Sequence, residues 1–124
     1  MASRDPAVDH LLELLAPMGE AAARRMFGGW GIYVDGLMIA LFADGVTHLK
    51  VDDFTRAAFE AAGSTPFVYR SKDRTITTSY WSLPEAALDS SEALQPWALR
   101  ALQAAQRKAQ KPTGSRKAPQ SRFS

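Results

Sequence analysis

Cysteine is absent from the 124 residues, and histidine occurs only twice, at His10 and His48. Without thiols the chain can form no disulfide, thiolate zinc site or iron–sulfur ligation, and it has no cysteine nucleophile. Two histidines are too few for a multi-histidine metal site, so we expect neither a metal nor another cofactor. The longest apolar run, residues 37–43, is far shorter than the about 20 residues of a membrane-spanning helix. The first residues do not show the basic segment and apolar core of a secretory signal. We therefore expect a soluble, cytoplasmic protein without membrane contacts.

Charge is distributed unevenly along the chain. The formal net charge is +2, but six of the 15 basic residues follow residue 106, where no acidic residue occurs. The other nine basic residues stand against 13 acidic ones, so the first 106 residues carry a net charge near −4. Residues 111–124 are rich in proline, serine, lysine and arginine and poor in apolar side chains, which is typical of disorder. We therefore expect one domain over residues 1–110 and a disordered basic tail over residues 111–124.

The basic end of the chain is a candidate for weak, non-specific nucleic-acid binding, because lysine and arginine displace counterions from the phosphate backbone. A solubilising end without a specific partner explains the same composition, since no aromatic side chains are interleaved with the charges. The candidate residues share a positive charge and a position after residue 106: Arg107, Lys108, Lys111, Arg116, Lys117 and Arg122.

Two Asp-Gly pairs organise the centre of the chain. Asp35-Gly36 and Asp44-Gly45 each separate two apolar runs, which is the strongest local indication of a two-residue type I′ hairpin. The run between them, residues 37–43, is apolar throughout and belongs at the centre of a sheet. β-Branched and aromatic runs elsewhere predict further strands. The predicted strands cover residues 22–27, 31–34, 37–42, 46–51, 67–69 and 75–83.

The flanking segments predict helices. Asp5 is an N-cap candidate before Pro6, and apolar residues at helical spacing follow as far as Pro17. The last helix begins near Ser91 or at Pro96, because proline disfavours helical geometry at the residue before it. Helices before, between and after antiparallel strands predict an α+β fold, a two-layer arrangement of an antiparallel meander with flanking helices in the order α-β(3–4)-α-β(2)-α.

A middle helix is expected to begin at a cap on Asp52 or Asp53 and to end near Ala62, with Gly63 as its stop. The two aspartates are therefore interpreted as a helix cap and not as metal ligands. The residues expected on the buried face of this helix are Phe54, Ala57, Ala58 and Ala61.

No constellation of side chains predicts an enzyme, and we name no catalytic residue. The Gly-Gly-Trp-Gly stretch at residues 28–31 leads into a strand, whereas a phosphate-binding loop leads into a helix and carries a lysine. The serines lack a Gly-x-Ser-x-Gly nucleophile elbow. His48 shares its strand face with Val46 and Lys50, which favours a solvated face, and His10 lies at the edge of the first helix's apolar stripe.

Aromatic side chains on the predicted strands are the remaining functional candidates. Rings of this kind usually belong to a core, but exposed ones can stack on bases or form an apolar patch for a protein partner. Stacking on nucleic acid also needs nearby cations, which are present as Arg24, Arg25, Arg70, Lys72 and Arg74. The aromatic residues concerned are Phe27, Trp30, Tyr33, Phe67, Tyr69, Tyr80 and Trp81.

Residues 25–33, Arg-Met-Phe-Gly-Gly-Trp-Gly-Ile-Tyr, followed by Asp-Gly and by Leu-Lys-Val-Asp at residues 49–52, resemble the N-terminal domain of TfoX/Sxy-type competence regulators. Pro66-Phe67-x-Tyr69 and Tyr80-Trp81-x-Leu83-Pro84-Glu85 continue the resemblance, which spans residues 8–107. It implies a two-layer fold similar to secretion-chaperone-like domains and carries over no catalytic residue. The signature residues, for which packing and chain reversal are a sufficient role, are Met26, Phe27, Gly28, Gly29, Trp30 and Gly31.

The resemblance also implies a transcriptional co-regulator of genes for DNA transformation, which in this family works with the cyclic-AMP receptor protein. The longer regulators have a second, helical domain, and we expect this chain to be a stand-alone, single-domain bacterial form. We expect a non-enzymatic regulatory or adaptor domain that acts through protein–protein contacts, including contacts with transcription machinery. The alternatives are a nucleic-acid-associated protein that uses its basic tail, and a small-ligand-binding domain or enzyme built on the aromatic strands. The chain could also form a homodimer, because an exposed edge strand of the sheet has to be covered and a second copy of the chain would cover it.

Overall fold

Six strands form one antiparallel sheet in the computed structural model, which describes residues 5–26 and 28–110. Their order across the sheet is β1-β2-β3-β4-β6-β5, so β1 and β5 are the edge strands and β3 lies in the interior, as predicted. Each strand pairs antiparallel with its neighbours. The strands are β1 (Ala21–Met26), β2 (Gly29–Val34), β3 (Leu37–Ala43), β4 (Val46–Lys50), β5 (Pro66–Ser71) and β6 (Arg74–Ser82).

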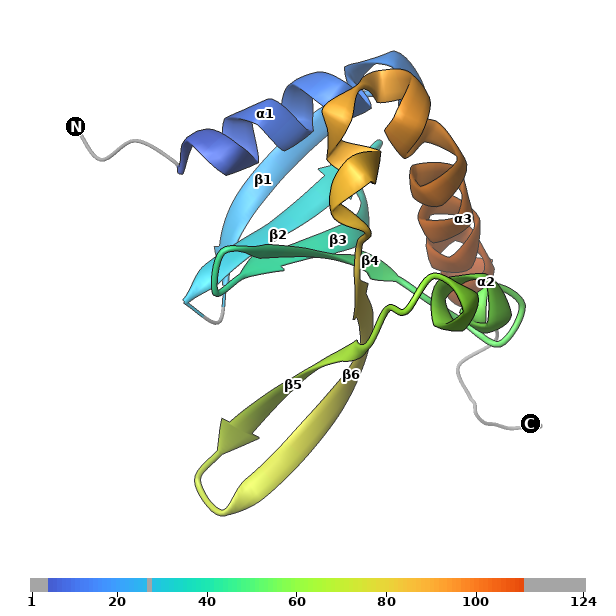
Figure 1. Cartoon of the computed structure of the whole chain (residues 1–124). Coiled ribbons are helices and arrows are strands. Elements are labelled where there is room, and N and C mark those ends of the chain that lie inside the picture. Colours follow the sequence, from blue (N-terminus) through green and yellow to red (C-terminus); the bar gives the residue numbers. More distant parts are fainter. Residues whose placement is uncertain (1–4, 27, 111–124) are drawn as a thin grey trace.

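Helices pack on one face of this sheet (Figure 1). The first helix rests on β1 and β2, and the last helix rests on β3 and β4. This arrangement confirms the predicted α+β fold class. The helices are α1 (Pro6–Leu15), α2 (Arg56–Ala61) and α3 (Ser91–Gln110), and two short 3-10 segments, η1 (Ala16–Met18) and η2 (Glu85–Asp89), accompany them.

Both Asp-Gly pairs form the predicted two-residue hairpin turns. Asp35 and Asp44 have φ values of 50° and 54°, and the glycines that follow them have values of 83° and 76°. Positive φ at both central residues is the requirement of a type I′ turn. The first turn is also tied to the edge of the sheet, because the Asp35 carboxylate accepts a hydrogen bond of 2.8 Å from the backbone N–H of Glu20.

The core lies between the helices and the inner face of the sheet. An extra residue in β3, where the register with β2 shifts, lets both Ile39 and Ala40 reach this core. Alanines on α3 let that helix approach the sheet closely. The fully buried members include Val8, Leu11 and Leu15 from α1, Ile32, Val34, Ile39 and Leu49 from the sheet, and Leu94, Ala98 and Ala101 from α3.

The middle helix differs from the prediction. The Asp52 carboxylate accepts hydrogen bonds from the backbone N–H groups of Phe54 and Thr55, and this turn delays the start of α2 to Arg56. The expected buried face is wrong, since Phe54 is 80% exposed and Phe59 is fully buried instead. A helix this short buries one large side chain, and a phenylalanine contributes far more apolar area than the alanines do. Of the expected face, Ala57 and Ala61 are exposed and Ala58 is half-buried.

The last helix begins at Ser91, the earlier of the two predicted starts. The Ser90 hydroxyl accepts a hydrogen bond of 3.0 Å from the backbone N–H of Ala93 and caps the helix. Pro96 lies inside the helix, where it removes one intrahelical hydrogen bond. The cap and the burial of Leu94 and Ala98 on either side of the proline maintain the helix.

His48 and Lys50 were expected on a solvated face, and this prediction is wrong. Their exposed fractions are 7% and 6%. The pair β5 and β6 leaves the body of the sheet as a two-stranded arm, drawn at the bottom of Figure 1. At the base of the arm the Phe67 ring packs edge-on against His48, with 5.0 Å between ring centroids. The arm therefore covers a strand face that alternation alone would leave in water, whereas His10 is exposed and bonds the Leu88 carbonyl.

Gly28, in the turn between β1 and β2, and Gly29, the first residue of β2, meet two different demands. Gly28 has a φ of 75° and open space around it, so it serves the chain reversal. A Cβ on Gly29 would overlap the carbonyl oxygen of Phe42 on the neighbouring strand β3, so this position requires close backbone approach.

We expect Gly29→Ala to lower the free energy of unfolding by about 2–3 kcal/mol, because a backbone carbonyl cannot move aside as a side chain does. Gly28→Ala is the matched control and is expected to cost about 1 kcal/mol, the strain of a left-handed alanine. Urea unfolding of both variants measures the difference. Equal losses for the two variants would contradict the assigned contact.

Candidate functional site

The face of the sheet that points away from the core carries aromatic and long apolar side chains. Successive strand residues point to opposite faces, so Tyr33 lies opposite the buried Ile32 and Val34. Strand register then places Tyr33 beside Met38. We call this surface the outer face. Its members, from β2, β3, β4 and the arm, are Tyr33, Met38, Leu41, His48, Lys50, Phe67, Tyr69, Ile76 and Tyr80.

Two hollows open on the outer face near the C-terminal end of α3. The first, called the aromatic hollow, has a volume of about 230 Å³. The second, called the helix-end hollow, has a volume of about 490 Å³ and adjoins the first at Met38, Lys50, Tyr80 and Lys108. The aromatic hollow is lined by Met38, Leu41, Lys50, Phe67, Tyr69, Ile76, Thr78, Ser79, Tyr80 and Lys108, and the helix-end hollow adds Leu37, Ala105 and Ala109.

The ammonium group of Lys50 places a positive charge where the two hollows meet. Its Nζ donates a hydrogen bond of 2.6 Å to the Ser79 hydroxyl and lies 5.1 Å from the centroid of the Tyr80 ring. The ring face and the hydroxyl stabilise the ammonium of a lysine residue whose exposed fraction is 6%. Burial, together with Tyr33, raises the pKa of the Tyr80 phenol to about 12, so this phenol is neutral at physiological pH. Lys50 is thus a cationic group held against a surface that is otherwise lined by apolar side chains, hydroxyl groups and Lys108.

Arginines on the edge strand β1 lie over two of the aromatic rings. The guanidinium carbon of Arg24 is 5.4 Å from the centroid of Tyr33, and that of Arg25 is 5.3 Å from the centroid of Trp30. A ring already covered by a guanidinium has less surface on which to stack a base. The other aromatic residues named as candidates in the sequence are half-buried, and Phe27 lies outside the described residues.

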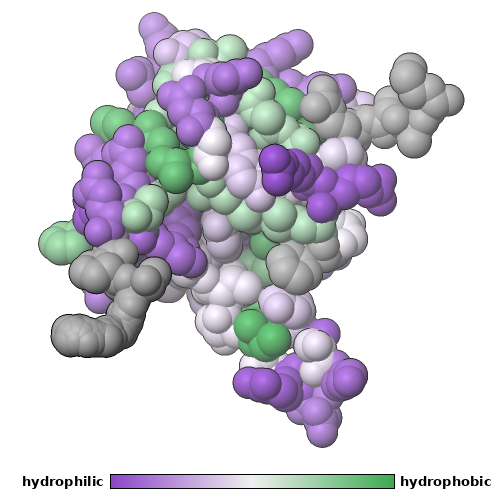
Figure 2. Space-filling model, turned by 180° about the vertical axis from the view of Figure 1, so that it is seen from behind, coloured by the Kyte–Doolittle hydropathy of each residue, from purple (hydrophilic) through white to green (hydrophobic). Residues whose placement is uncertain are grey.

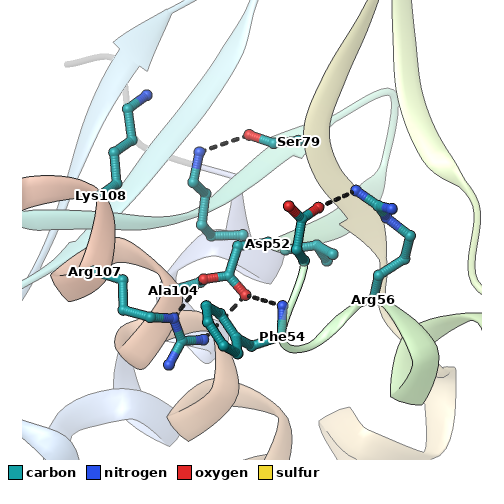
Figure 3. Close-up of a pocket in the computed structure, with 10 residues that line it drawn as sticks. Asp52, Phe54, Arg56, Ser79, Ala104, Arg107 and Lys108 are labelled. Atoms are coloured by element: carbon teal, nitrogen blue, oxygen red, sulfur yellow. Dashed lines mark hydrogen bonds and ion pairs between the residues drawn. The ribbon is translucent and has the colours of Figure 1, made fainter. Parts of the chain in front are cut away.

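A third hollow, of about 410 Å³, lies behind the loop that precedes α2 (Figure 3). There the Asp52 carboxylate accepts hydrogen bonds of 2.6 Å from Arg107 Nε and 3.0 Å from Arg107 Nη2. The same guanidinium lies 4.6 Å from the centroid of the exposed Phe54 ring. The hydrogen bond from Arg107 lowers the pKa of Asp52 below its ordinary value of 3.8. The pair joins residues 55 positions apart and fixes the end of α3 to the loop.

The residues named as nucleic-acid candidates fall into two groups. Arg107 and Lys108 lie in the last turns of α3, where Arg107 is committed to Asp52. The other four, Lys111, Arg116, Lys117 and Arg122, lie outside the described residues. Non-specific nucleic-acid binding by this set stays a prediction.

Among residues 5–26 and 28–110 no group of three histidines, cysteines or carboxylates could hold a metal ion. None of the helices in that part of the chain is long and apolar enough to cross a membrane. Sequence reasoning did not name Lys50 as a functional candidate, and it named Lys108 only as a candidate for nucleic-acid binding. The strand pairing that places Lys50 beside Tyr80, and the position of the end of α3, show that the two lysines share one surface.

A six-stranded sheet with helices on one face and an aromatic, lysine-bearing surface on the other defines a small α+β domain whose functional candidate is a surface on the sheet. Comparison with protein-family models matches residues 13–105, three quarters of the chain, to the TfoX N-terminal domain. The chain belongs to this family of regulatory domains, which is associated with competence regulation and has no known catalytic activity. The resemblance seen in the sequence is thereby confirmed. A comparison with curated proteins finds no match.

The burial of His48 predicts a pH-dependent stability. Burial lowers the pKa of His48 below 6.5, so the unfolded chain takes up its proton at a higher pH than the folded chain. The stability contributed by the neutral imidazole is complete above pH 6.5 and is lost as the pH falls below that value.

We expect His48→Gln and His48→Phe to flatten the dependence of unfolding free energy on pH between 7.5 and about 5, measured by urea unfolding. The two variants differ in polarity but both lack a titrating ring, so they should share the shallower slope even where their absolute stabilities differ. A wild-type slope retained in both would contradict the buried neutral histidine.

The Asp52–Arg107 pair predicts a second pH dependence of stability, which comes from a charged carboxylate and not from a neutral imidazole. We expect Arg107→Ala to lower the unfolding midpoint at pH 7, and the difference from wild type to shrink as the pH falls from 3.8 through the lowered pKa of Asp52, because the protonated carboxyl no longer pairs with the guanidinium. Thermal unfolding at several pH values measures this. Arg56→Ala, which removes the exposed ion pair with Asp53, is the matched control and should change the midpoint little. In an Asp52→Asn background the Arg107 substitution should have no pH-dependent effect.

Proposed function

We propose that this chain is a non-enzymatic regulatory domain of competence control that acts in the cytoplasm by binding a protein partner through its outer face. The family supports the regulatory assignment, and the outer face supports the mode of action. The observation that carries the proposal is the cluster of aromatic and apolar side chains on the outer face, which the arm partly covers and the C-terminal end of α3 borders, while the helices pack on the opposite face of the sheet.

The composition of the outer face fits a protein interface. Such interfaces are enriched in tyrosine, phenylalanine, methionine and arginine, and their centres are poor in charge. The outer face has Tyr33, Tyr69 and Tyr80 beside Met38 and Phe67. These side chains are half-buried, so they present ring edges and methyl groups that are already ordered before a partner arrives. Pre-ordered side chains lower the entropy lost on association.

The arm extends this surface away from the body. Seen from behind, the arm is of intermediate hydropathy near its base, carries one hydrophobic spot further along, and ends in a hydrophilic tip (Figure 2). Val68 on the edge strand β5 is 45% exposed, and an edge strand offers unpaired backbone groups to a partner. The partner that we propose is a component of the transcription machinery, and a second copy of the chain is the competing occupant that the test below distinguishes.

Photo-crosslinking in the cells that encode the protein tests this proposal. With p-benzoylphenylalanine in place of Tyr69, on the outer face, we expect one adduct of defined mass that survives nuclease treatment. The same residue at Leu99, which is 44% exposed on α3, is the matched control and should give none. The proposed regulation further requires that deletion of the gene lowers transcripts for DNA uptake, and that wild type but not Tyr69→Asp restores them.

An adduct with the mass of two chains would assign the outer face to self-association. Crosslinking only at Leu99, or an adduct removed by nuclease, would contradict the proposed protein partner. Unchanged transcripts in the deletion strain would contradict the role in competence.

A further inference from the structure

The two hollows of the outer face combine apolar walls with positive charge. Lys50 and Lys108 line both hollows, and none of the described residues that line them is acidic. This contrasts with the first 106 residues as a whole, where acidic residues outnumber basic ones. The same lysines also line the third hollow with Asp52 and Asp53, but these two carboxylates pair with Arg107 and Arg56. The lysines are therefore a local excess of positive charge, which favours an anionic group at this position.

The size of the aromatic hollow limits what can enter it. At about 230 Å³ it is smaller than the roughly 300–1,000 Å³ of sites that hold whole small-molecule ligands, so it suits a single side chain. Its walls are formed by aromatic and aliphatic side chains, which include Leu41, Phe67, Tyr69 and Ile76. An aromatic or long aliphatic side chain matches these walls.

The two lysines act at different depths. Lys50 is buried, and the Ser79 hydroxyl and the Tyr80 ring hold its ammonium in place. Lys108 is exposed on the last turns of α3, at the mouth of both hollows. A carboxylate at the mouth lies within the field of both ammonium groups, and a partly desolvated charge pair is stronger than one in open water.

We propose that the outer face receives an acidic–apolar segment of the protein partner. Its aspartate or glutamate carboxylate lies between Lys50 and Lys108, and the neighbouring apolar side chain fills the aromatic hollow. This inference rests on the proposed function and names the chemistry of the partner. Nucleic acid fits less well, because a stacked base needs an open ring face and the hollow is walled on several sides by side chains.

Titration of the full-length, ¹⁵N-labelled chain with short peptides tests the proposal. The probes are acetyl-Glu-Phe-amide, its neutral match acetyl-Gln-Phe-amide, and acetyl-Glu-Ala-amide, which keeps the charge and lacks the ring. We expect millimolar binding of the first probe, with amide shifts concentrated at residues of both hollows, and binding at least about fivefold weaker for each of the other two, the equivalent of about 1 kcal/mol.

Lys108→Ala is the test variant, because its exposed side chain is not part of the core. This substitution should lower the affinity for acetyl-Glu-Phe-amide about threefold to fivefold, as expected for the loss of an exposed charge contact. Arg74→Ala, which removes one positive charge at the exposed start of β6, is the matched control and should leave the affinity unchanged.

Equal affinity for the three peptides, shifts outside the hollows, or stronger binding of a 12-nucleotide single strand at the same residues would overturn the inference. The proposed function is tested separately. If the Tyr69 crosslink forms equally well in Lys108→Ala and the peptides do not bind, the partner uses the outer face without a carboxylate. If the chain with p-benzoylphenylalanine at position 69 and no other substitution gives no crosslink, that result contradicts the proposed function itself.

Discussion

The inner face of the sheet has to be covered by helices, and most of the structure follows from that requirement. A six-stranded sheet whose inner face is apolar is stable in water only when that face is buried, and α1 and α3 supply the cover. Alanines on α3 let the helix lie close to β3 and β4. Once both long helices pack on one side, the other side of the sheet is left for the arm and for solvent. The outer face is therefore a consequence of how the core is closed.

The end of α3 connects this core to the candidate site. Arg107 fixes the last turns of the helix to Asp52, and Lys108, the next residue, is thereby placed at the mouth of the two hollows. The same aspartate shapes the turn before α2 through its bond to Phe54. One carboxylate thus sets both the start of a short helix and, through Arg107, the position of Lys108 at the other end of the described chain. It links the stability of the domain to the geometry of the surface that we propose as its interface.

Local chemistry made much of the fold predictable. An Asp-Gly pair between apolar runs has few alternatives to a tight turn, and Asp5 before Pro6 starts a helix almost regardless of context. The errors occurred where several distant segments compete. Alternation along β4 indicated a solvated His48, but the Phe67 ring from the arm covers it. The spacing in residues 54–61 indicated an alanine-rich buried face, but the Asp52 turn and the greater apolar area of Phe59 decided otherwise.

The sequence by itself determined the turns, the order of strands and helices, and membership of a family, because each depends on neighbouring residues or on a motif read in register. Only the tertiary structure decided which side chains share a surface. Lys50, Tyr80 and Lys108 lie on three separate elements, and their meeting depends on the twist of the sheet, the bend of the arm and the length of α3. The burial and the charge of a site depend on segments that are far apart in the chain. A pattern of neighbouring residues therefore cannot predict them.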